Sequence, residues 1–321
     1  MSTLAPILVQ ANTLPFLQMG DWGGQDTAPF TTPSQLNVAK AMSQYSHKFQ
    51  PQFLLSAGDN FYEKGVESIF STRFNDTFNN VYTDVDLEIP WYIIAGNHDH
   101  EGDIMAQIMY TFTSNRWFFP NFWYTFNYTF GDEHENAIIV QFINIDTVIL
   151  AGQWTDDDGW LPVPDEFQSQ TQIEMDWIEQ QLNNSTADWI IVTGHYPVFS
   201  VAEHGPNSFL VDWLKPLLEK FGVATYLCGH EHDMEHLIHK NVNYIVNGAG
   251  HELDVSTKHI KDVPEGSLKF IYPTKDDKVD VKMGGGFTSL EIFNKREMKF
   301  SFLDQNATVI YSYTIVNPRL T

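Results

Sequence analysis

Residues 53–62 read Phe-Leu-Leu-Ser-Ala-Gly-Asp-Asn-Phe-Tyr, a short apolar run that ends in a glycine turn carrying an acid and a phenol. The same arrangement recurs in four other places along the chain. Those runs and turns are Phe16–Met19 before Gly-Asp-Trp-Gly, Trp91–Ala95 before Gly-Asn-His-Asp, Trp189–Thr193 before Gly-His-Tyr-Pro, and Ala224–Cys228 before Gly-His-Glu-His. Short runs of branched and aromatic residues are typical of buried strands, so the sequence predicts five strands that end in polar turns.

The stretches between these runs favour helices, near residues 34–49, 168–182 and 208–221. Pro216 should kink or divide the last of them, because proline removes a helical hydrogen bond. Strands that alternate with helices predict a layered α/β fold, in which ligand sites gather at the carboxyl ends of the strands. The polar turns are therefore expected to form one site.

Two other segments differ from this pattern. The runs Gly286–Phe293, Met298–Leu303 and Val309–Ile315 are joined by short turns and predict an antiparallel meander that closes one edge of a sheet. Residues 151–168 are acidic and contain several glycines and prolines, so we expect an exposed loop there.

The composition excludes several classes of protein. The chain has 321 residues, of which 43% are hydrophobic, enough for one large α/β domain or two small ones. No apolar run approaches the roughly 18–20 residues that a membrane span needs, so we expect a soluble protein. The formal net charge of −23 argues against binding to nucleic acid. A site for phosphate would need a local positive charge of its own, which metal ions could supply.

The compartment is difficult to read from the sequence. The single cysteine, Cys228, lies in an apolar run and is expected to be buried and unreactive. Residues 1–19 lack the basic start and the apolar core of a signal peptide. Glycosylation sequons, which would suit a secreted glycoprotein, begin at Asn75, Asn127, Asn183, Asn184 and Asn306.

The polar turns together offer a set of metal ligands: Asp21, Asp59, Tyr62, Asn97, His195, His230 and His232. Hard oxygen donors suit a trivalent ion, whereas imidazoles and an amide suit a divalent transition metal. Asp59 could bridge two ions about 3.5–4 Å apart, the arrangement used for in-line displacement at phosphorus. One such turn alone is more often structural. His230 and His232, one residue apart on an extended segment, should point to the same side.

The ordered motifs Gly-Asp-x-Gly, Gly-Asp-x-x-Tyr, Gly-Asn-His-Asp, Gly-His-Tyr-Pro and Gly-His-x-His resemble those of the metallophosphoesterases. Tyr62 narrows the resemblance to the purple acid phosphatases. Residues 196–206, Tyr-Pro-Val-Phe-Ser-Val-Ala-Glu-His-Gly-Pro, look like the small, tartrate-resistant mammalian type. The similarity covers residues 14–315, so it implies a single catalytic domain over 1–321. The implied fold is a four-layer α/β/β/α sandwich with mixed sheets.

The resemblance also implies the metals and their ligands. It assigns Asp21, Asp59, Tyr62 and His232 to Fe(III), and it assigns Asp59, Asn97, His195 and His230 to a divalent ion, which is Fe, Zn or Mn across the family. The expected activity is hydrolysis of phosphate monoesters in acid, by attack of a metal-bound hydroxide on phosphorus.

Further residues are expected around the metals. The resemblance places His98 near the phosphate oxygens and His204, beside Glu203, at the phosphate or the leaving group, where an imidazole can act as a general acid. Asp99 could orient His98 or His195. Three other histidines are expected to be structural or solvent-facing: His100, His236 and His251.

Other functions stay open at this point. A diesterase or nucleotide hydrolase could use the same metals, because the walls of the pocket decide between these substrates. A non-catalytic metal-binding protein is a third reading, but it predicts lost ligands and all seven positions are filled. We expect a monomer that acts on small phosphate esters or phosphorylated proteins, in lysosomes or after secretion.

Overall fold

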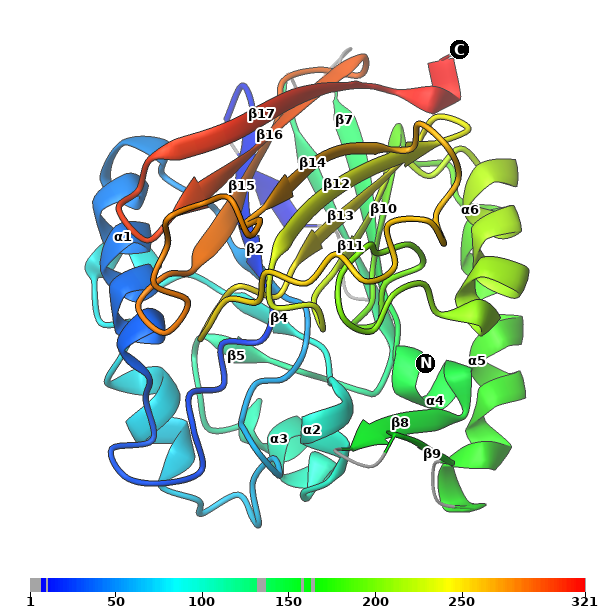
Figure 1. Cartoon of the computed structure of the whole chain (residues 1–321). Helices are drawn as coiled ribbons and strands as arrows, with labels where there is room; N and C mark the ends of the chain where they lie inside the picture. Colours follow the sequence, from blue (N-terminus) through cyan, green and yellow to red (C-terminus); the bar gives the residue numbers. More distant parts are fainter. Residues whose placement is uncertain (1–6, 10, 132–136, 157–158, 163–164, 321) are drawn as a thin grey trace.

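In the computed structural model, two mixed β-sheets pack face to face, and helices cover both outer faces (Figure 1). The structure describes residues 7–9, 11–131, 137–156, 159–162 and 165–320. Within these residues the layers follow the order helix, sheet, sheet, helix. This confirms the predicted four-layer α/β/β/α sandwich.

The seven-stranded sheet contains the first three predicted strands and the C-terminal meander. In spatial order its strands are β17 (Val309–Val316), β16 (Glu297–Asp304), β15 (Gly286–Ile292), β2 (Leu14–Met19), β3 (Leu54–Ser56), β4 (Trp91–Ile93) and β5 (Trp117–Phe118). The strands from β2 to β5 run parallel, whereas β15, β16 and β17 are antiparallel to their neighbours. The meander therefore forms the predicted edge of this sheet.

The eight-stranded sheet contains the other two predicted strands. In spatial order its strands are β1 (Ile7–Val9), β6 (Tyr124–Phe130), β7 (Ile138–Asn144), β10 (Trp189–Thr193), β11 (Thr225–Cys228), β13 (Val242–Asn247), β12 (Met234–His239) and β14 (Leu268–Tyr272). β7, β10, β11 and β13 are parallel at the centre, so their carboxyl ends lie along one edge. That edge faces the carboxyl ends of β2, β3 and β4 in the other sheet.

The helices begin and end where local chemistry predicts. Thr32 caps α1 (Pro33–Phe49) by accepting a hydrogen bond from the amide of Gln35, and Gln50 ends this helix in a left-handed conformation. The other α-helices are α2 (Asn97–His100), α3 (Ile104–Tyr110), α4 (Thr147–Ala151), α5 (Asp165–Asn184) and α6 (Lys215–Lys220). The shorter helical segments are η1 (Phe74–Asn79), η2 (Val85–Leu87), η3 (Leu210–Leu214) and η4 (Pro318–Leu320).

The helical segment near 208–221 is divided into two segments next to the proline, as predicted. Residues 210–214 form the π-helical turn η3, and α6 follows with Pro216 in its first turn. A proline is tolerated there because the first amides of a helix have no partner within it.

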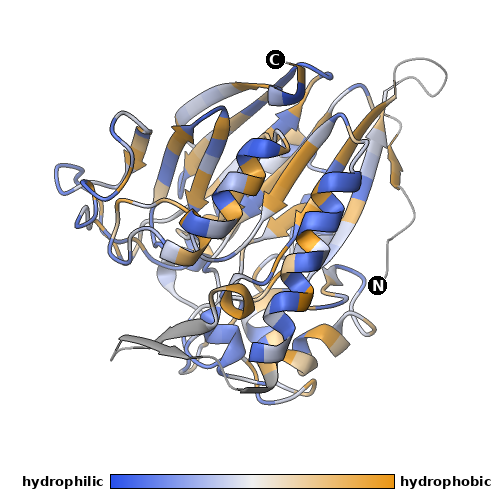
Figure 2. Ribbon diagram, turned by 90° about the vertical axis from the view of Figure 1, so that its right-hand side faces the viewer, coloured by the Kyte–Doolittle hydropathy of each residue, from blue (hydrophilic) through white to orange (hydrophobic). Residues whose placement is uncertain are grey.

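Aromatic side chains fill the space between the two sheets. Phe16 stacks on Phe53 at 4.9 Å between ring centroids, and both meet Phe142 of the opposite sheet edge-on, at 5.4 and 5.2 Å. A second apolar cluster, which includes Trp177 and Leu214, lies between the eight-stranded sheet and α4, α5 and α6. Figure 2 shows these outer helices with hydrophobic residues toward the sheet and hydrophilic residues toward solvent. Burial of apolar side chains between the layers therefore holds the layers together.

The expected loop at 151–168 is wrong in part. A hairpin of β8 (Gln153–Asp156) and β9 (Gly159–Pro162) occupies most of it, and α5 begins at Asp165. Trp154, Thr155 and Trp160 favour strands, and the acidic turn signal lies between the two strands instead of spanning the segment. The exposure of these side chains lies outside the described residues.

Among the described residues, no helix has both the length and the apolar character needed to cross a bilayer.

Candidate metal centre

Both sheets deliver predicted ligands to the edge where they meet. Asp21, Asp59 and Asn97 follow β2, β3 and β4, whereas His195 follows β10, and the turn after β11 carries His230 and His232. Parallel strands bring their carboxyl ends to one edge of a sheet, and packing two sheets face to face joins two such edges. The structure therefore brings together residues that are up to 211 positions apart, from 21 to 232.

A first group surrounds the phenol of Tyr62. Its oxygen lies 2.9 Å from Asp21 Oδ1, 3.1 Å from Asp59 Oδ2 and 3.0 Å from His232 Nε2. Tyr62 is 2% exposed and the two carboxylates are buried as well. Four potential ligand atoms thus converge on one small buried volume.

A second group surrounds His195. Its Nε2 lies 2.9 Å from Asn97 Oδ1 and 3.4 Å from Asp59 Oδ2, while its Nδ1 lies 2.8 Å from the carbonyl oxygen of Ala57. Ligand atoms of Asp59, His195 and His230 all lie within 4.8 Å of one another. Asp59 takes part in both groups, which is the position of a bridging carboxylate.

Three of the predicted ligands have a left-handed backbone: φ is 58° at Asp21, 51° at Asp59 and 70° at His230. Residues with a Cβ rarely adopt this conformation because it brings Cβ close to the backbone. Such strain persists where the surrounding structure imposes it and is found at functional sites.

The glycines before the ligands are needed for close approach. A Cβ on Gly96 would lie 2.2 Å from Asp59 Oδ1, and a Cβ on Gly229 would lie 2.2 Å from Asp21 Oδ2. Both distances are far inside van der Waals contact. The repeated glycine of the sequence motifs therefore leaves room for the neighbouring carboxylate.

The expected extended segment at His230 and His232 is wrong, although both side chains reach the site. The chain bends twice there, with the amide of Glu231 donating to the carbonyl of Gly229 at 2.9 Å and that of Asp233 to the carbonyl of Glu231 at 2.7 Å. These tight turns send the two imidazoles to different groups. His230 joins Asp59 and His195, whereas His232 joins Tyr62.

Opposite charges set the protonation of the second group. Burial raises the pKa of Asp59, but His195 and His98 outweigh it and hold this pKa well below its usual range. Burial lowers the pKa of His195, but Asp59 outweighs it and raises the pKa to about 9. Burial, with a contribution from His204 and His195, lowers the pKa of His230 well below its usual value. His230 is thus a neutral imidazole, the form that binds a metal.

The first group contains buried acids whose ionised forms a cation would stabilise. Burial raises the pKa of Asp21, and burial together with Asp21 and Asp59 raises the pKa of Tyr62 well above 10. A phenol in contact with two carboxylates ionises only when a positive ion compensates the charge. The four donors of this group are two carboxylates, a phenol and an imidazole. This set suits a hard trivalent ion.

Residues 14–234 match the calcineurin-like phosphoesterase family, which covers more than half of the chain. The chain belongs to this family. The family implies a dinuclear metal centre, and the two groups around Asp59 contain residues that could hold metal ions.

Curated relatives place the phosphoesterase near the purple acid phosphatases. It is 38% identical over 301 residues to tartrate-resistant acid phosphatase type 5 of Oryctolagus cuniculus, which covers 93% of this chain and 90% of the relative. The human protein of the same name is 38% identical over 312 residues, or 96% and 93% of the two chains. Purple acid phosphatase 3 of Arabidopsis thaliana is 29% identical over 315 residues and covers 94% and 77%. The predicted resemblance is confirmed.

Solved structures show the same fold. "GAP50 the anchor in the inner membrane complex of Plasmodium" superposes with a TM-score of 0.78 at 24% identity and covers 95% of this chain and 89% of that one. The purple acid phosphatase PPD1 of yellow lupin gives a TM-score of 0.62 at 17% identity, over 96% and 54%. At these identities the likeness concerns the fold alone.

His98 and His204 of the phosphoesterase lie beside the two groups. The amide of His98 donates to Asp59 Oδ1 at 3.0 Å, and its Nδ1 lies 2.6 Å from the carbonyl oxygen of Glu63. Burial alone would lower the pKa of His98, but Asp59 and the Glu63 carbonyl raise it above its usual value. The ring of His204 lies 4.3 Å from that of His230, between centroids.

Glu231, which no sequence motif indicates, contacts His204. Its carboxylate accepts from the amides of His204 and Gly205 at 3.0 and 2.8 Å, and lies 3.2 Å from His204 Nδ1. The predicted neighbour Glu203 turns away, toward Ser256 Oγ at 2.8 Å and Lys258 Nζ at 3.0 Å. Glu231, and not Glu203, is therefore the acid in direct contact with His204.

Asp99 orients the backbone and not a histidine. Its carboxylate accepts from the amides of Asn60 and Gly96 at 3.1 and 2.9 Å, and from Gln107 Nε2 at 2.8 Å. These bonds join the turns that carry Asp59 and Asn97. The expected contact with His98 or His195 is replaced by this buried network.

His251, which we expect from sequence to be structural or solvent-facing, lies at the site together with Glu252. His251 is buried, its ring lies 4.1 Å from that of Tyr62, and its Nδ1 lies 2.7 Å from the carbonyl oxygen of Asp21. Glu252 faces His232. A signal existed, because β13 ends at Asn247 and Gly-Ala-Gly follows, as in the other five strand-and-turn patterns.

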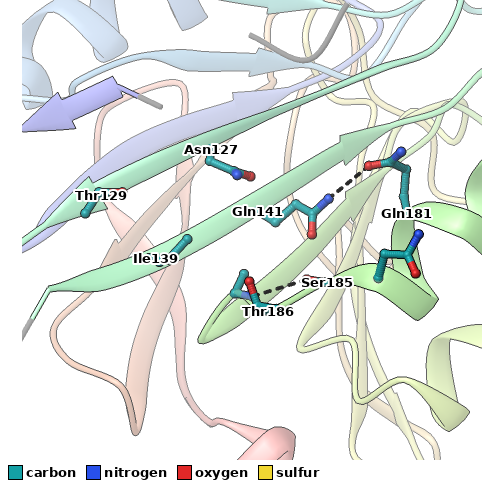
Figure 3. Close-up of a pocket in the computed structure, with 9 residues that line it drawn as sticks. Asn127, Thr129, Ile139, Gln141, Gln181, Ser185 and Thr186 are labelled. Carbon is teal, nitrogen blue, oxygen red and sulfur yellow. Dashed lines mark hydrogen bonds between the residues drawn. The ribbon is translucent and has the colours of Figure 1, made fainter. Parts of the chain in front are cut away.

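A separate hollow of about 220 Å³ lies between β6, β7 and the end of α5 (Figure 3). Amide and hydroxyl groups line it, and Gln141 Nε2 donates to Gln181 Oε1 at 3.3 Å. It contains two of the sequon asparagines, Asn127 and Asn184, and none of the predicted site residues.

Proposed function

We propose that the chain is an acid phosphatase that hydrolyses phosphate monoesters at a dinuclear centre of Fe(III) and a divalent ion, Fe, Zn or Mn. The observation that carries this proposal is the phenol of Tyr62, held within about 3 Å of two carboxylates and an imidazole. The relatives named as tartrate-resistant and purple acid phosphatases support it.

The two groups divide the ligands. Asp21, Asp59, Tyr62 and His232 would hold Fe(III), whereas Asp59, Asn97, His195 and His230 would hold the divalent ion. Two ions in such a set supply, when bound, an activated water and neutralisation of phosphoryl charge. The excess positive charge would also attract an anionic ester to a chain whose net charge is −23.

His98 would bind the phosphate. Its contact with the Glu63 carbonyl oxygen fixes the ring and leaves the other ring nitrogen for the ester, and the side chain is 25% exposed. The raised pKa of His98 favours the cationic form in acid, which suits a phosphate oxygen.

His204 would give its proton to the leaving alkoxide. Its side chain is 40% exposed, and Glu231 fixes the Nδ1 side of the ring, so Nε2 is the nitrogen that can reach the ester. Glu203 would act indirectly, since its bonds to Ser256 and Lys258 anchor the loop that carries His204.

The same resemblance gives expectations for the oligomeric state, the substrates and the location of the enzyme. We expect a single domain over 1–321 that works as a monomer on small phosphate esters or phosphorylated proteins, and not on nucleic acid. Lysosomal or extracellular placement would suit an acid phosphatase. The sequon residues Asn75, Asn183, Asn184 and Asn306 are exposed and could carry glycans.

A comparison of two esters tests the proposed activity. The metal-loaded protein should hydrolyse a phosphate monoester faster than a diester with the same leaving group, and faster in mild acid than at neutral pH. Asp59→Ala should abolish both reactions, and His47→Ala, an exposed histidine on α1, serves as the control. Faster cleavage of the diester would favour the alternative of a phosphodiesterase or nucleotide hydrolase. No hydrolysis by protein that holds both metals would favour a non-catalytic role.

A further inference from the structure

His232 has a different partner on each ring nitrogen. Its Nε2 lies 3.0 Å from the phenol oxygen of Tyr62 and 3.5 Å from Asp21 Oδ1, and its Nδ1 lies 3.5 Å from Glu252 Oε1. We propose that Glu252 is a positioning residue for His232, and that Glu252 and Lys282 together set how strongly this imidazole donates electrons to iron. This inference rests on the proposed iron site.

The backbone fixes Glu252 in this place. The amide of Asp254 donates to the carbonyl of His232 at 2.7 Å, and the amide of Leu253 donates to the carbonyl of Val281 at 3.0 Å. The segment 252–254 is thus bonded on one side to the residue that carries the imidazole, and on the other to the residue before Lys282. These bonds hold the backbone next to Glu252 close to both partners.

The two oxygens of Glu252 are divided between a buried and an exposed partner. Oε1 faces His232, whereas Oε2 forms an ion pair with Nζ of Lys282. The Glu252 side chain is 29% exposed and that of Lys282 is 72% exposed. The pair with His232 is therefore shielded from solvent more than the pair with Lys282, and salt should screen the latter more strongly.

A carboxylate beside the N–H of a ligating imidazole makes the imidazole a stronger donor and holds its orientation. Stronger donation stabilises Fe(III) relative to Fe(II), so Glu252 should lower the reduction potential of the iron. It should also raise the energy of charge transfer from the Tyr62 phenolate to Fe(III). Lys282 withdraws charge from Glu252 and should have the opposite, smaller effect on both quantities.

Two variants separate these effects in the metal-loaded protein. Glu252→Gln keeps the size of the side chain and removes its charge, and Lys282→Gln removes only the opposing charge. The exposed residues Glu265 and Lys278 give matched controls, Glu265→Gln and Lys278→Gln. For each protein we would record the visible band, the reduction potential of the iron and the rate of iron loss to a chelator, at low and high salt.

We expect Glu252→Gln to move the visible band to longer wavelength, to raise the reduction potential and to weaken iron retention by about 10- to 100-fold. Lys282→Gln should move the band and the potential in the opposite direction, by an amount that falls with salt. Neither control should move them. Shifts in the same direction for the two variants, or none in folded protein that holds iron, would overturn the inference alone. An unaltered protein that holds iron but has no visible band would overturn the proposed iron site and this inference with it.

Discussion

The phenol oxygen of Tyr62 lies 2.9 Å from Oδ1 of Asp21, although the two residues are 41 positions apart in sequence. Parallel pairing of β2 with β3 and the turns that follow these strands produce the contact. Two buried carboxylates around one phenol repel its ionised form unless a cation lies among them. The contact therefore makes Tyr62 the residue whose replacement should report most clearly on the metal.

Tyr62→Phe should remove the visible charge-transfer band while the fold is kept. The ring would still pack on His98 and His251, at 4.6 and 4.1 Å between centroids. Loss of the hydroxyl removes a buried donor to Asp21 and Asp59 and should lower the free energy of unfolding of the metal-free protein by about 1–3 kcal/mol. Absorption spectra and urea unfolding check both statements, with Tyr45→Phe, outside the centre, as the control. A band that survives in the variant would show that another group produces it.

His204→Ala should slow hydrolysis according to the leaving group. Loss of a general acid should reduce kcat by about 10²- to 10⁴-fold for an alkyl phosphate and much less for an activated aryl phosphate. Glu231→Gln should follow the same trend with a smaller loss, because it acts only through His204. Equal losses for both esters would argue that His204 binds phosphate and does not donate a proton.

Removal of the metals should lower the thermal stability of the protein. Ions that bind only the folded chain stabilise it in proportion to the logarithm of their concentration over Kd. Asp59 takes part in both groups of ligands, so Asp59→Asn should nearly abolish the difference in Tm between the loaded and the chelated protein. The same Tm before and after chelation of the unaltered protein would contradict a metal centre within the core.

The metal-free protein should lose stability in acid through His236. Burial lowers the pKa of this side chain from 6.5 to about 4. The unfolded chain therefore binds the proton more readily, and the stabilising contribution is full above pH 6.5 and lost as the pH falls to 4. The shift corresponds to about 3 kcal/mol. Urea unfolding between pH 4 and 7 should show a smaller loss for His236→Gln than for the exposed control His47→Gln. Equal losses would assign the acid sensitivity to other groups.

The five strands and the ligand set could be predicted because each is encoded locally. An apolar run ends, a glycine follows, and a ligand comes next, so short stretches such as Phe53–Tyr62 carry both the strand and the chemistry. The C-terminal meander and α1 were predictable for the same reason. Pro216 marked the start of α6 through its missing amide.

The contacts around the ligands could not be predicted because they join distant segments. Glu231 and not Glu203 holds His204, and this depends on which side of a tight turn each carboxylate faces. Glu252 reaches His232 only because β13 returns beside β11. The hairpin of β8 and β9 was missed because the acidic sequence Asp156–Asp158 outweighed the strand propensity of Trp154 and Trp160.

The visible absorption spectrum of purified protein, with metal analysis of the same sample, tests the central claim most directly. If Tyr62 binds Fe(III), the protein will be purple, with a broad band, and will hold iron and a second metal at about one each per chain. Iron without this band would show that Tyr62 is not a ligand. A colourless protein fully loaded with two zinc or two manganese ions would contradict the proposed Fe(III) site in the same way.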